Sequence, residues 1–413
     1  MSDFIEQNFS REVDLLRALV RVPSDNPPGD CARHAEAAAV LLEKLGFKVE
    51  RHPVPAELVK RHGMVSVTNL IIRERFGPGN GPVIALNAHG DVVPPGQGWT
   101  HDPYGAKEQG GAIYGRGAAV SKSDFASYAF ALLALKERPA GLDGTVEMHL
   151  TYDEEAGGFV GPKWLLDERI SKPDFAISAG FSYAVVTAHN GVLHLEVTVK
   201  GRQAHAAMPE SGADALAAAT AVLTALYAER KRLTKRQSKE AGIGTPKLTV
   251  GLISGGINTN VVPDRIVMRL DRRLIPEENG AKVEKALIAL IKRAAKGKGI
   301  SVECRRIILA EPLKPIAGIE KLVEPLQRHG RRELKARIPV KGAPLFTDAR
   351  HYSARGIPTV LYGAGPRSIL EANAHGANEH IKLSDLKAAT RVIEATLRDV
   401  LGQSSAAILA NAG

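Results

Sequence analysis

The chain has 413 residues, 44% of them hydrophobic, with 40 glycines, 24 prolines and a formal net charge of +10. This length exceeds one ordinary domain, and the composition excludes a fibre or a disordered chain in favour of a loop-rich globular enzyme. No apolar run approaches the roughly 18 residues of a membrane span. The densest basic run, 229–236, contains no aromatic residue and adjoins a predicted helix end, so we expect a solvated loop there. We therefore expect no nucleic-acid or membrane partner, and the positive charge favours a small anionic substrate.

The N-terminus and the two cysteines favour the cytoplasm. Residues 1–6 lack the basic and apolar regions of a signal peptide. Cys31 and Cys304 lie far apart in the sequence and form no metal or redox motif. A reducing cytoplasm is therefore the expected compartment.

The first part of the chain alternates helical and extended patterns. Helices are expected at 10–20, with Ser10 as N-cap, at 31–45, with Gly46 just beyond the end, and at 122–136. Apolar strands are expected at 69–72, 83–86 and 146–152. This alternation indicates a largely parallel sheet with helices on both faces.

The pattern changes near Gly191. Residues 193–199 alternate strictly between apolar and polar, as a half-exposed strand would. Further elements are expected as a helix at 213–228, strands at 247–252 and 265–270, a helix at 281–296 and a strand at 300–308. After Pro312 the first pattern resumes, with a strand at 358–362 and a last helix from Ser384. The prediction is an α/β, mostly parallel-sheet catalytic domain in two segments, 1–190 and 311–413, interrupted by a smaller α+β domain at 191–310 with an antiparallel sheet.

A histidine and an aspartate two residues apart follow the apolar run 83–86. On an extended backbone such positions point to one face. The Asp91 carboxylate could then accept the proton of one imidazole nitrogen of His89 while the other nitrogen faces a metal. In a largely parallel sheet, ligands bind beyond the carboxyl ends of the strands, where His89 and 153–155 are both expected. A His-x-Asp pair alone is more often just a hydrogen-bonded pair at a strand end.

The acidic run Asp153-Glu154-Glu155, followed by two glycines, is a second signal at a strand end. Two adjacent carboxylates cannot both face one way in an extended chain. One could therefore ligate a metal while the other handles the proton of a water. The alternative is a solvated acidic turn, which would be the better interpretation of Glu-Glu alone.

With its other motifs in place, the chain resembles the co-catalytic zinc amidohydrolase and exopeptidase family. Its members include acetylornithine deacetylase, succinyl-diaminopimelate desuccinylase, aminoacylase and carboxypeptidase G. The resemblance covers nearly the whole length, in the right order. The motifs that carry it are 26–29, 89–94, Trp99 with 102–104, 114–118, 153–155, 201–205, 260–263, 271–273, 347–348 and 374–379.

The resemblance implies roles for five residues of the catalytic domain. His89, Glu155 and His375 would be metal ligands. Asp91 would be the orienting carboxylate, and Glu154 the general base that deprotonates a metal-activated water.

The resemblance also implies that the insertion 191–310 is a lid and dimerisation domain, and hence that the protein is a homodimer through this lid. His205 of the lid would polarise the scissile carbonyl and stabilise the developing oxyanion, often across the dimer. Asn260 and Arg273 would contact the substrate, and Arg273 is suited to clamp a carboxylate bidentately. From the residues alone, His205 would be a surface histidine and Arg273 the ion-pair partner of Asp271.

Two metal ligands of the family pattern are replaced. Val120 stands where the family has an Asp that bridges two metals, and Gly180 where it has a Glu or Asp six residues after Asp174. Without these carboxylates two nearby cations would repel strongly, so one ion is favoured over two. Asp124, one helical turn after Val120, is either a displaced ligand or a helix-start aspartate favoured by the dipole.

The retained groups suffice for one zinc or manganese ion, with cobalt as a further candidate. The predicted function is a metal-dependent hydrolase of the peptidase or deacylase type. It would cleave the amide C–N bond of a small carboxylate-bearing substrate with a metal-activated water. Two alternatives stay open: an aminohydrolase (deaminase) acting on a non-peptide substrate, and a non-catalytic homologue that binds a small molecule or a partner. The retained cluster around His89 argues against the second alternative, because an idle site has no physical need for it.

Overall fold

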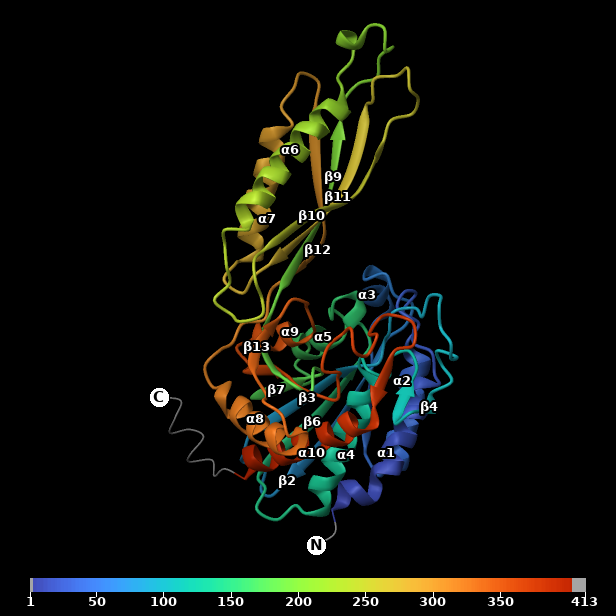
Figure 1. The fold of residues 1–413 in the computed structure, drawn as a ribbon, viewed down its shortest axis with the longest axis vertical. Helices are drawn as coiled ribbons and strands as arrows, with labels where there is room; N and C mark the ends of the chain where they lie inside the picture. The colour runs from blue at the N-terminus through green and yellow to red at the C-terminus, as the bar shows by residue number, and fades with distance from the viewer. Residues whose placement is uncertain (1–2, 403–413) are drawn as a thin grey trace. The chain divides into compact units, whose positions relative to one another are not determined.

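The computed structural model describes residues 3–402, which form two compact units (Figure 1). The first unit comprises the chain up to residue 187, residues 315–341 and the chain from 347 onward; the second comprises 188–314 and 342–346. The boundaries expected from the sequence, 190/191 and 310/311, lie within a few residues of two of these limits. The return of 342–346 to the second unit was not expected. Residues 403–413 of the last predicted segment lie outside the described part of the chain.

The main sheet has eight strands in the order β1-β2-β6-β3-β7-β14-β8-β13. Its middle is parallel and consists of β6 (Gly144–Thr151), β3 (Val83–His89), β7 (Phe175–Ser178) and β14 (Thr359–Leu361). The antiparallel flanks are β1 (Val49–Pro53), β2 (Thr68–Phe76) and β8 (Val185–His189), and β13 (Val340–Ala343) forms the last edge. The predicted mostly parallel sheet is confirmed.

Helices cover both faces of this sheet, as predicted. One face carries α4 (Lys122–Glu137), which packs against α1 (Phe4–Val20) and α10 (Leu383–Leu401). On the same face, α2 (Ala32–Lys44) packs against α1, and α8 (Glu320–Leu334) packs against α10. The other face carries α5 (Pro162–Asp167) and α9 (Ala349–Ser353). Because successive side chains of a strand alternate, Ile84 and Leu86 of β3 enter the large core under α4, whereas Ala85 packs with Tyr352 of α9.

The second unit is a four-stranded antiparallel sheet with two helices. Its strand order is β10 (Lys247–Gly255), β11 (Arg265–Leu274), β9 (Gly191–Lys200) and β12 (Ser301–Ala310). The helices are α6 (Ala215–Leu233) and α7 (Gly280–Ala294). The alternation expected in β9 is observed, because Leu193, Leu195, Val197 and Val199 are all buried in the core of this unit.

Short elements complete the chain. A small sheet contains β15 (His380–Lys382), β5 (Ala112–Tyr114) and β4 (Lys107–Gln109). The remaining short helices are α3 (Ala56–Arg61) and the 3-10 turns η1 (Glu154–Ala156) and η2 (Pro209–Ser211). Within residues 3–402, no helix has the length and apolarity needed to cross a membrane.

Two element predictions were wrong at a helix end. Helix α1 begins at Phe4 rather than after Ser10, because the Asp3 carboxylate accepts hydrogen bonds from the main-chain N–H groups of Ile5 (3.1 Å) and Glu6 (3.3 Å). Helix α6 continues to Leu233, so the start of the basic run 229–236 is a last helical turn rather than a loop. Cations in a last turn interact favourably with the helix dipole.

Candidate metal centre

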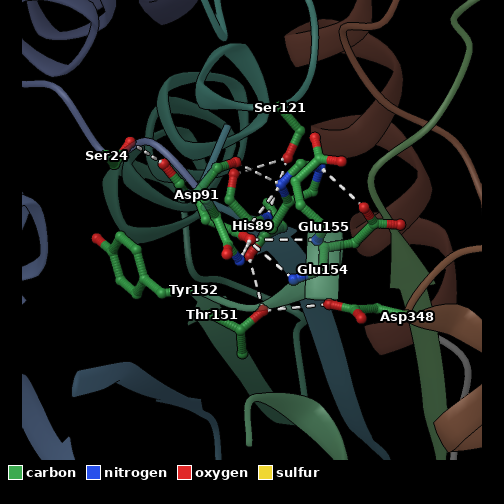
Figure 2. A network of polar contacts seen from close by, with 12 residues as sticks. Ser24, His89, Asp91, Ser121, Thr151, Tyr152, Glu154, Glu155 and Asp348 are labelled. Carbon is green, nitrogen blue, oxygen red and sulfur yellow. Dashed lines mark hydrogen bonds and ion pairs between the residues drawn. The ribbon is translucent and has the colours of Figure 1, made fainter. Parts of the chain in front are cut away.

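The candidate site lies at the carboxyl ends of β3 and β6. These strands are adjacent and parallel, with His89, the last residue of β3, opposite Thr151, the last residue of β6. The turn η1 follows two residues after β6 and carries Glu154 and Glu155. Because the carboxyl ends of parallel strands meet at one edge, side chains far apart in the sequence converge there (Figure 2).

His89 is 5% exposed and held through its main chain and its ring. Its N–H donates to the Ser121 hydroxyl, which donates in turn to the His89 carbonyl, both at 3.0 Å. Ring atom Nδ1 lies 2.9 Å from the main-chain oxygen of Asp91 and 3.4 Å from Asp91 Oδ1. Because a carbonyl oxygen only accepts, Nδ1 carries a proton. The other ring nitrogen, Nε2, lies 4.0 Å from Glu154 Oε2 and is the atom that can bind a metal ion. The shorter contact is to the Asp91 carbonyl, not to the carboxylate expected from the sequence.

The Asp91 carboxylate holds the turn that carries the two glutamates. It is fully buried and accepts hydrogen bonds from the N–H groups of Glu154 (3.2 Å) and Glu155 (3.1 Å) and from the Asn26 amide (2.9 Å). Asp91 thus fixes the acidic turn relative to His89.

His89, Glu154 and Glu155 present ligand atoms that all lie within 4.8 Å of one another. Glu155 Oε1 is a buried atom and lies 3.2 Å from His375 Nε2, with which it forms an ion pair. Partial burial of several carboxylates side by side costs free energy, which a bound cation would compensate. An imidazole nitrogen and carboxylate oxygens are suitable donors for one divalent transition-metal ion, so the residues present fit such an ion.

Glu154 has the electrostatic environment of a proton-transfer group. Burial raises the pKa of Glu154 to about 8; His89 opposes this shift, and the Glu155 and Asp91 carboxylates add to it. A carboxyl group whose pKa is close to neutral pH can both take and return a proton.

Asp124 is not brought into this group. It is buried in the first turn of α4, and its Oδ1 accepts a hydrogen bond from the Ala364 N–H at 2.8 Å. Burial raises the pKa of Asp124 to about 7. The contact with Ala364 supports a structural role over that of a displaced ligand.

The two replaced positions leave little room for a second set of ligands. Val120 has no ligand atom. At Gly180, an added Cβ would lie 2.7 Å from Leu361 Cβ and 2.9 Å from both the Leu361 carbonyl carbon and the Tyr362 nitrogen. Leu361 at the end of β14 and the backbone of Tyr362 therefore fill the space that a carboxylate side chain at position 180 would need.

Asp348, the N-cap of α9, and two residues of α9 lie beside the acidic turn, and the sequence predicted no role for them. Asp348 accepts a hydrogen bond from the Thr151 hydroxyl (3.3 Å), and burial raises the pKa of Asp348 to about 8. Arg350 and His351 both donate to the Gly157 carbonyl, the His351 contact at 3.0 Å. The sequence did contain a signal for this polar group. Strand β6 has polar residues at alternate positions (147, 149 and 151), which is typical of a strand with one polar buried face.

The three candidate lid residues all belong to the second unit, but they do not lie together. His205 forms a β-bridge with Val261, and the Ala206 N–H donates to the Asn260 carbonyl at 3.0 Å, so His205 and Asn260 are neighbours. Both are exposed.

Arg273 lies at the opposite end of the strand that follows Asn260. At about 3.4 Å per residue, the stretch of β11 from Arg265 to Arg273 spans roughly 27 Å. The Arg273 Nε atom lies 3.0 and 3.1 Å from the Asp271 oxygens, the ion pair expected from the residues alone. One small substrate cannot reach both ends of β11.

Comparison with known proteins gives consistent matches. Residues 85–399 match the family model described as Peptidase family M20/M25/M40. The chain is 31% identical over 314 residues to succinyl-diaminopimelate desuccinylase of Acidiphilium cryptum, covering 73% of this chain and 78% of that protein. It is 26% identical to aminoacylase-1 of Sus scrofa, covering 89% and 90% of the two chains.

Solved structures with the same fold include peptidases. Aminopeptidase PepT of Bacillus cereus superposes with a TM-score of 0.73 at 24% identity, covering 95% of this chain and 99% of that chain. The YXEP protein of Bacillus subtilis, described as a dinuclear metal binding peptidase, superposes with a TM-score of 0.71 at 17% identity, covering 96% and 99%.

Proposed function

The chain belongs to peptidase family M20/M25/M40 and is a metal-dependent hydrolase of amide C–N bonds, and we propose that it acts with a single divalent ion on a small N-acyl substrate that carries a carboxylate. One observation carries the proposal. His89, Glu154 and Glu155 converge within 4.8 Å although two ligands of the dinuclear pattern are replaced. A bound cation would compensate the charge of the two partly buried glutamates, of which Glu155 lies 3.2 Å from His375 and Glu154 lies 4.0 Å from His89.

The ion would be held by His89, Glu155 and His375, with zinc, manganese or cobalt as the candidate metals. When bound, such an ion activates water and polarises a carbonyl as a Lewis acid. Val120 and the filled space beside Gly180 favour one ion over two. Asp124, turned toward Ala364, is left outside the ligand set.

The chain's own residues then divide the chemistry. Glu154 takes a proton from the attacking water and returns it to the leaving nitrogen. Asp91 keeps the acidic turn in place through the two glutamate N–H groups, and its carbonyl fixes the proton of His89 on Nδ1.

The substrate class rests on the relatives and on one arginine. A desuccinylase and an aminoacylase, at 31% and 26% identity, are named for removing acyl groups. Arg273 offers a planar guanidinium suited to a substrate carboxylate. Asp271, the ion-pair partner of Arg273, also lies 2.9 Å from His194 Nε2. If Arg273 leaves Asp271 to bind a substrate carboxylate, Asp271 therefore keeps His194 as a partner.

A homodimer through the second unit is part of this proposal. His205 and Asn260 lie at one end of β11 and Arg273 at the other. Two copies joined through this unit would allow one active site to use Arg273 of one chain and the His205–Asn260 end of the other. His205 then stabilises the oxyanion of a site in the other subunit. The proposed compartment is the cytoplasm, where the two free cysteines, Cys31 and Cys304, stay reduced.

The testing experiment combines metal analysis with product analysis. Protein purified without chelators is assayed for zinc, manganese and cobalt per chain, then incubated with N-acetyl and N-succinyl amino acids. We expect about one equivalent of metal, and release of the free amino acid that stops with EDTA. Two equivalents would reject the single-ion proposal. Ammonia without free acid would identify an aminohydrolase, and a protein that binds no metal after reconstitution would be the non-catalytic homologue.

A further inference from the structure

Arg116 and Glu379 form a buried ion pair that connects three loops of the first unit. Their side chains are each 1% exposed, and Arg116 Nη1 lies 2.6 Å from Glu379 Oε2. We propose that this pair is a positioning device for the metal ligand His375, an inference that rests on the metal site proposed above.

Arg116 reaches His375 directly. Its Nη2 donates to the carbonyl of His375 at 3.3 Å and to the carbonyl of Pro95 at 3.1 Å, and the guanidinium lies over the Trp99 ring, 5.2 Å from its centroid. The arginine is therefore fixed from several sides, and it transmits that fixed position to the main chain of His375.

Glu379 ties the same pair to the turn that precedes α4. Its Oε1 accepts hydrogen bonds from the N–H groups of Ala119 (3.0 Å) and Val120 (3.2 Å). In this chain Val120 supplies no ligand atom. The connection from the ion pair to the metal therefore passes through His375 rather than through position 120.

His375 needs such support because its ring is not held by packing. The side chain is 51% exposed, and its contact in the site is Glu155 Oε1 at 3.2 Å. The backbone of His375 has φ of 64°, in the left-handed region that non-glycine residues rarely adopt. Surrounding contacts must maintain this conformation, and the hydrogen bond from Arg116 to its carbonyl is one of them.

Arginine is the side chain that this position requires. A guanidinium can donate to Glu379 and to two carbonyls at once because its donors form a rigid fork. A lysine would keep its charge opposite Glu379 but, as a compact ammonium group, would lose the bridge to His375. Arg116→Lys is therefore expected to keep the positive charge beside Glu379 and to remove the hydrogen bond to the His375 carbonyl.

The test is a double-mutant cycle read out as Co²⁺ affinity, by competition with a chelating dye. The four proteins are the wild type, Arg116→Lys, His375→Ala and the double variant. We expect Arg116→Lys to bind Co²⁺ about 10-fold or more weakly, the usual effect of losing a contact that orients a ligand. If Arg116 acts through His375, the same change in the His375→Ala background adds almost nothing. An equal loss in both backgrounds, or no loss in either, overturns the proposal.

Controls separate positioning from stability and from the proposed function itself. Arg272 of the second unit forms an ion pair of similar burial with Glu278 at 2.6 Å and also donates to a main-chain carbonyl, so Arg272→Lys is the matched variant. It should leave Co²⁺ affinity unchanged. Glu379→Gln keeps an acceptor for the Ala119 and Val120 N–H groups and should show the same coupling to His375 if Arg116→Lys does not fold. A wild type that binds no Co²⁺ refutes the metal site and this inference together; a wild type that binds without coupling refutes the inference alone.

Discussion

At the scale of single residues, Gly180 lies where a neighbouring backbone passes too close for any side chain. An added Cβ would meet the carbonyl carbon of Leu361 and the nitrogen of Tyr362 at 2.9 Å, and neither can move as a flexible side chain would. We predict that Gly180→Ala lowers the free energy of unfolding by about 1–3 kcal/mol, the usual cost of overpacking. Urea denaturation measures the change. Gly251→Ala is the control, because a Cβ there meets no atom within 4 Å. Equal stability of the two variants would contradict the steric argument.

Glu154 and Glu155 are adjacent, yet their substitutions should have different effects. We predict that Glu154→Gln lowers kcat by roughly 10²- to 10⁴-fold, because it removes the proton acceptor and keeps the shape of the side chain. Its metal content should stay at the wild-type level, since His89, Glu155 and His375 are intact. Glu155→Gln should lower the metal content as well. Elemental analysis beside steady-state kinetics distinguishes the two, with Glu168→Gln on the exposed end of α5 as control. Loss of metal from Glu154→Gln would make Glu154 a ligand instead of a base.

At the scale of elements, Glu12 lies buried where α1, α4 and α10 meet. Its Oε1 accepts a hydrogen bond from Thr390 of α10 at 2.5 Å, and Oε2 is buried without a hydrogen-bond partner within the described chain. Burial raises the pKa of Glu12 to about 8. The folded state therefore holds this proton more tightly than the unfolded state, in which a glutamate titrates near 4.3.

The sign of the pH dependence follows from this shift. Stability from protonated Glu12 is fully present below the unfolded pKa and is lost as the pH rises through the folded value of about 8. We predict that Glu12→Gln, which stays neutral, is more stable than the wild type at pH 8, by on the order of 4 kcal/mol, and that the difference shrinks toward pH 5. Urea unfolding at several pH values provides the measurement. Glu57→Gln on exposed α3 should follow the wild-type profile. A Glu12→Gln profile that is parallel to the wild type would refute the buried-acid argument.

Strong periodicity is what made elements predictable. The alternation of β9 and the strand–helix alternation of the first unit are local patterns, and the sheet class followed from them. His89 could be placed because a strand end has a defined location in a parallel sheet. The actual contacts of Asp91 and Asp124 depend on which main-chain groups lie opposite them, and Ala364 is far from Asp124 in the sequence. The Arg116–Glu379 pair likewise joins positions whose proximity only the fold establishes.

At the scale of the whole molecule, the proposed dimer gives a prediction that does not depend on knowing the interface. Glu154 belongs to the first unit, and His205 lies in the second unit beside Asn260. If each active site takes His205 from the other subunit, His205→Ala and Glu154→Gln fall in the same site of a mixed dimer. One site then combines an intact Glu154 with an intact His205, and the other site contains both defects. Coexpression at equal levels should pair the chains at random, so that half of the dimers are mixed and about a quarter of all sites are intact.

The measurement is activity after coexpression with two different tags, compared with each variant alone. Recovery to about a quarter of the wild-type activity is expected, and the tags show that mixed dimers formed. The matched control pairs Glu154→Gln with His89→Ala. Both residues belong to the first unit and lie in one cluster, so no site of their mixed dimer is intact and no activity should return. If His205→Ala and Glu154→Gln also fail to complement in mixed dimers, His205 either serves its own subunit or takes no part. The separation along β11 would then require another explanation, such as an Arg273 that stays with Asp271 and never meets the substrate.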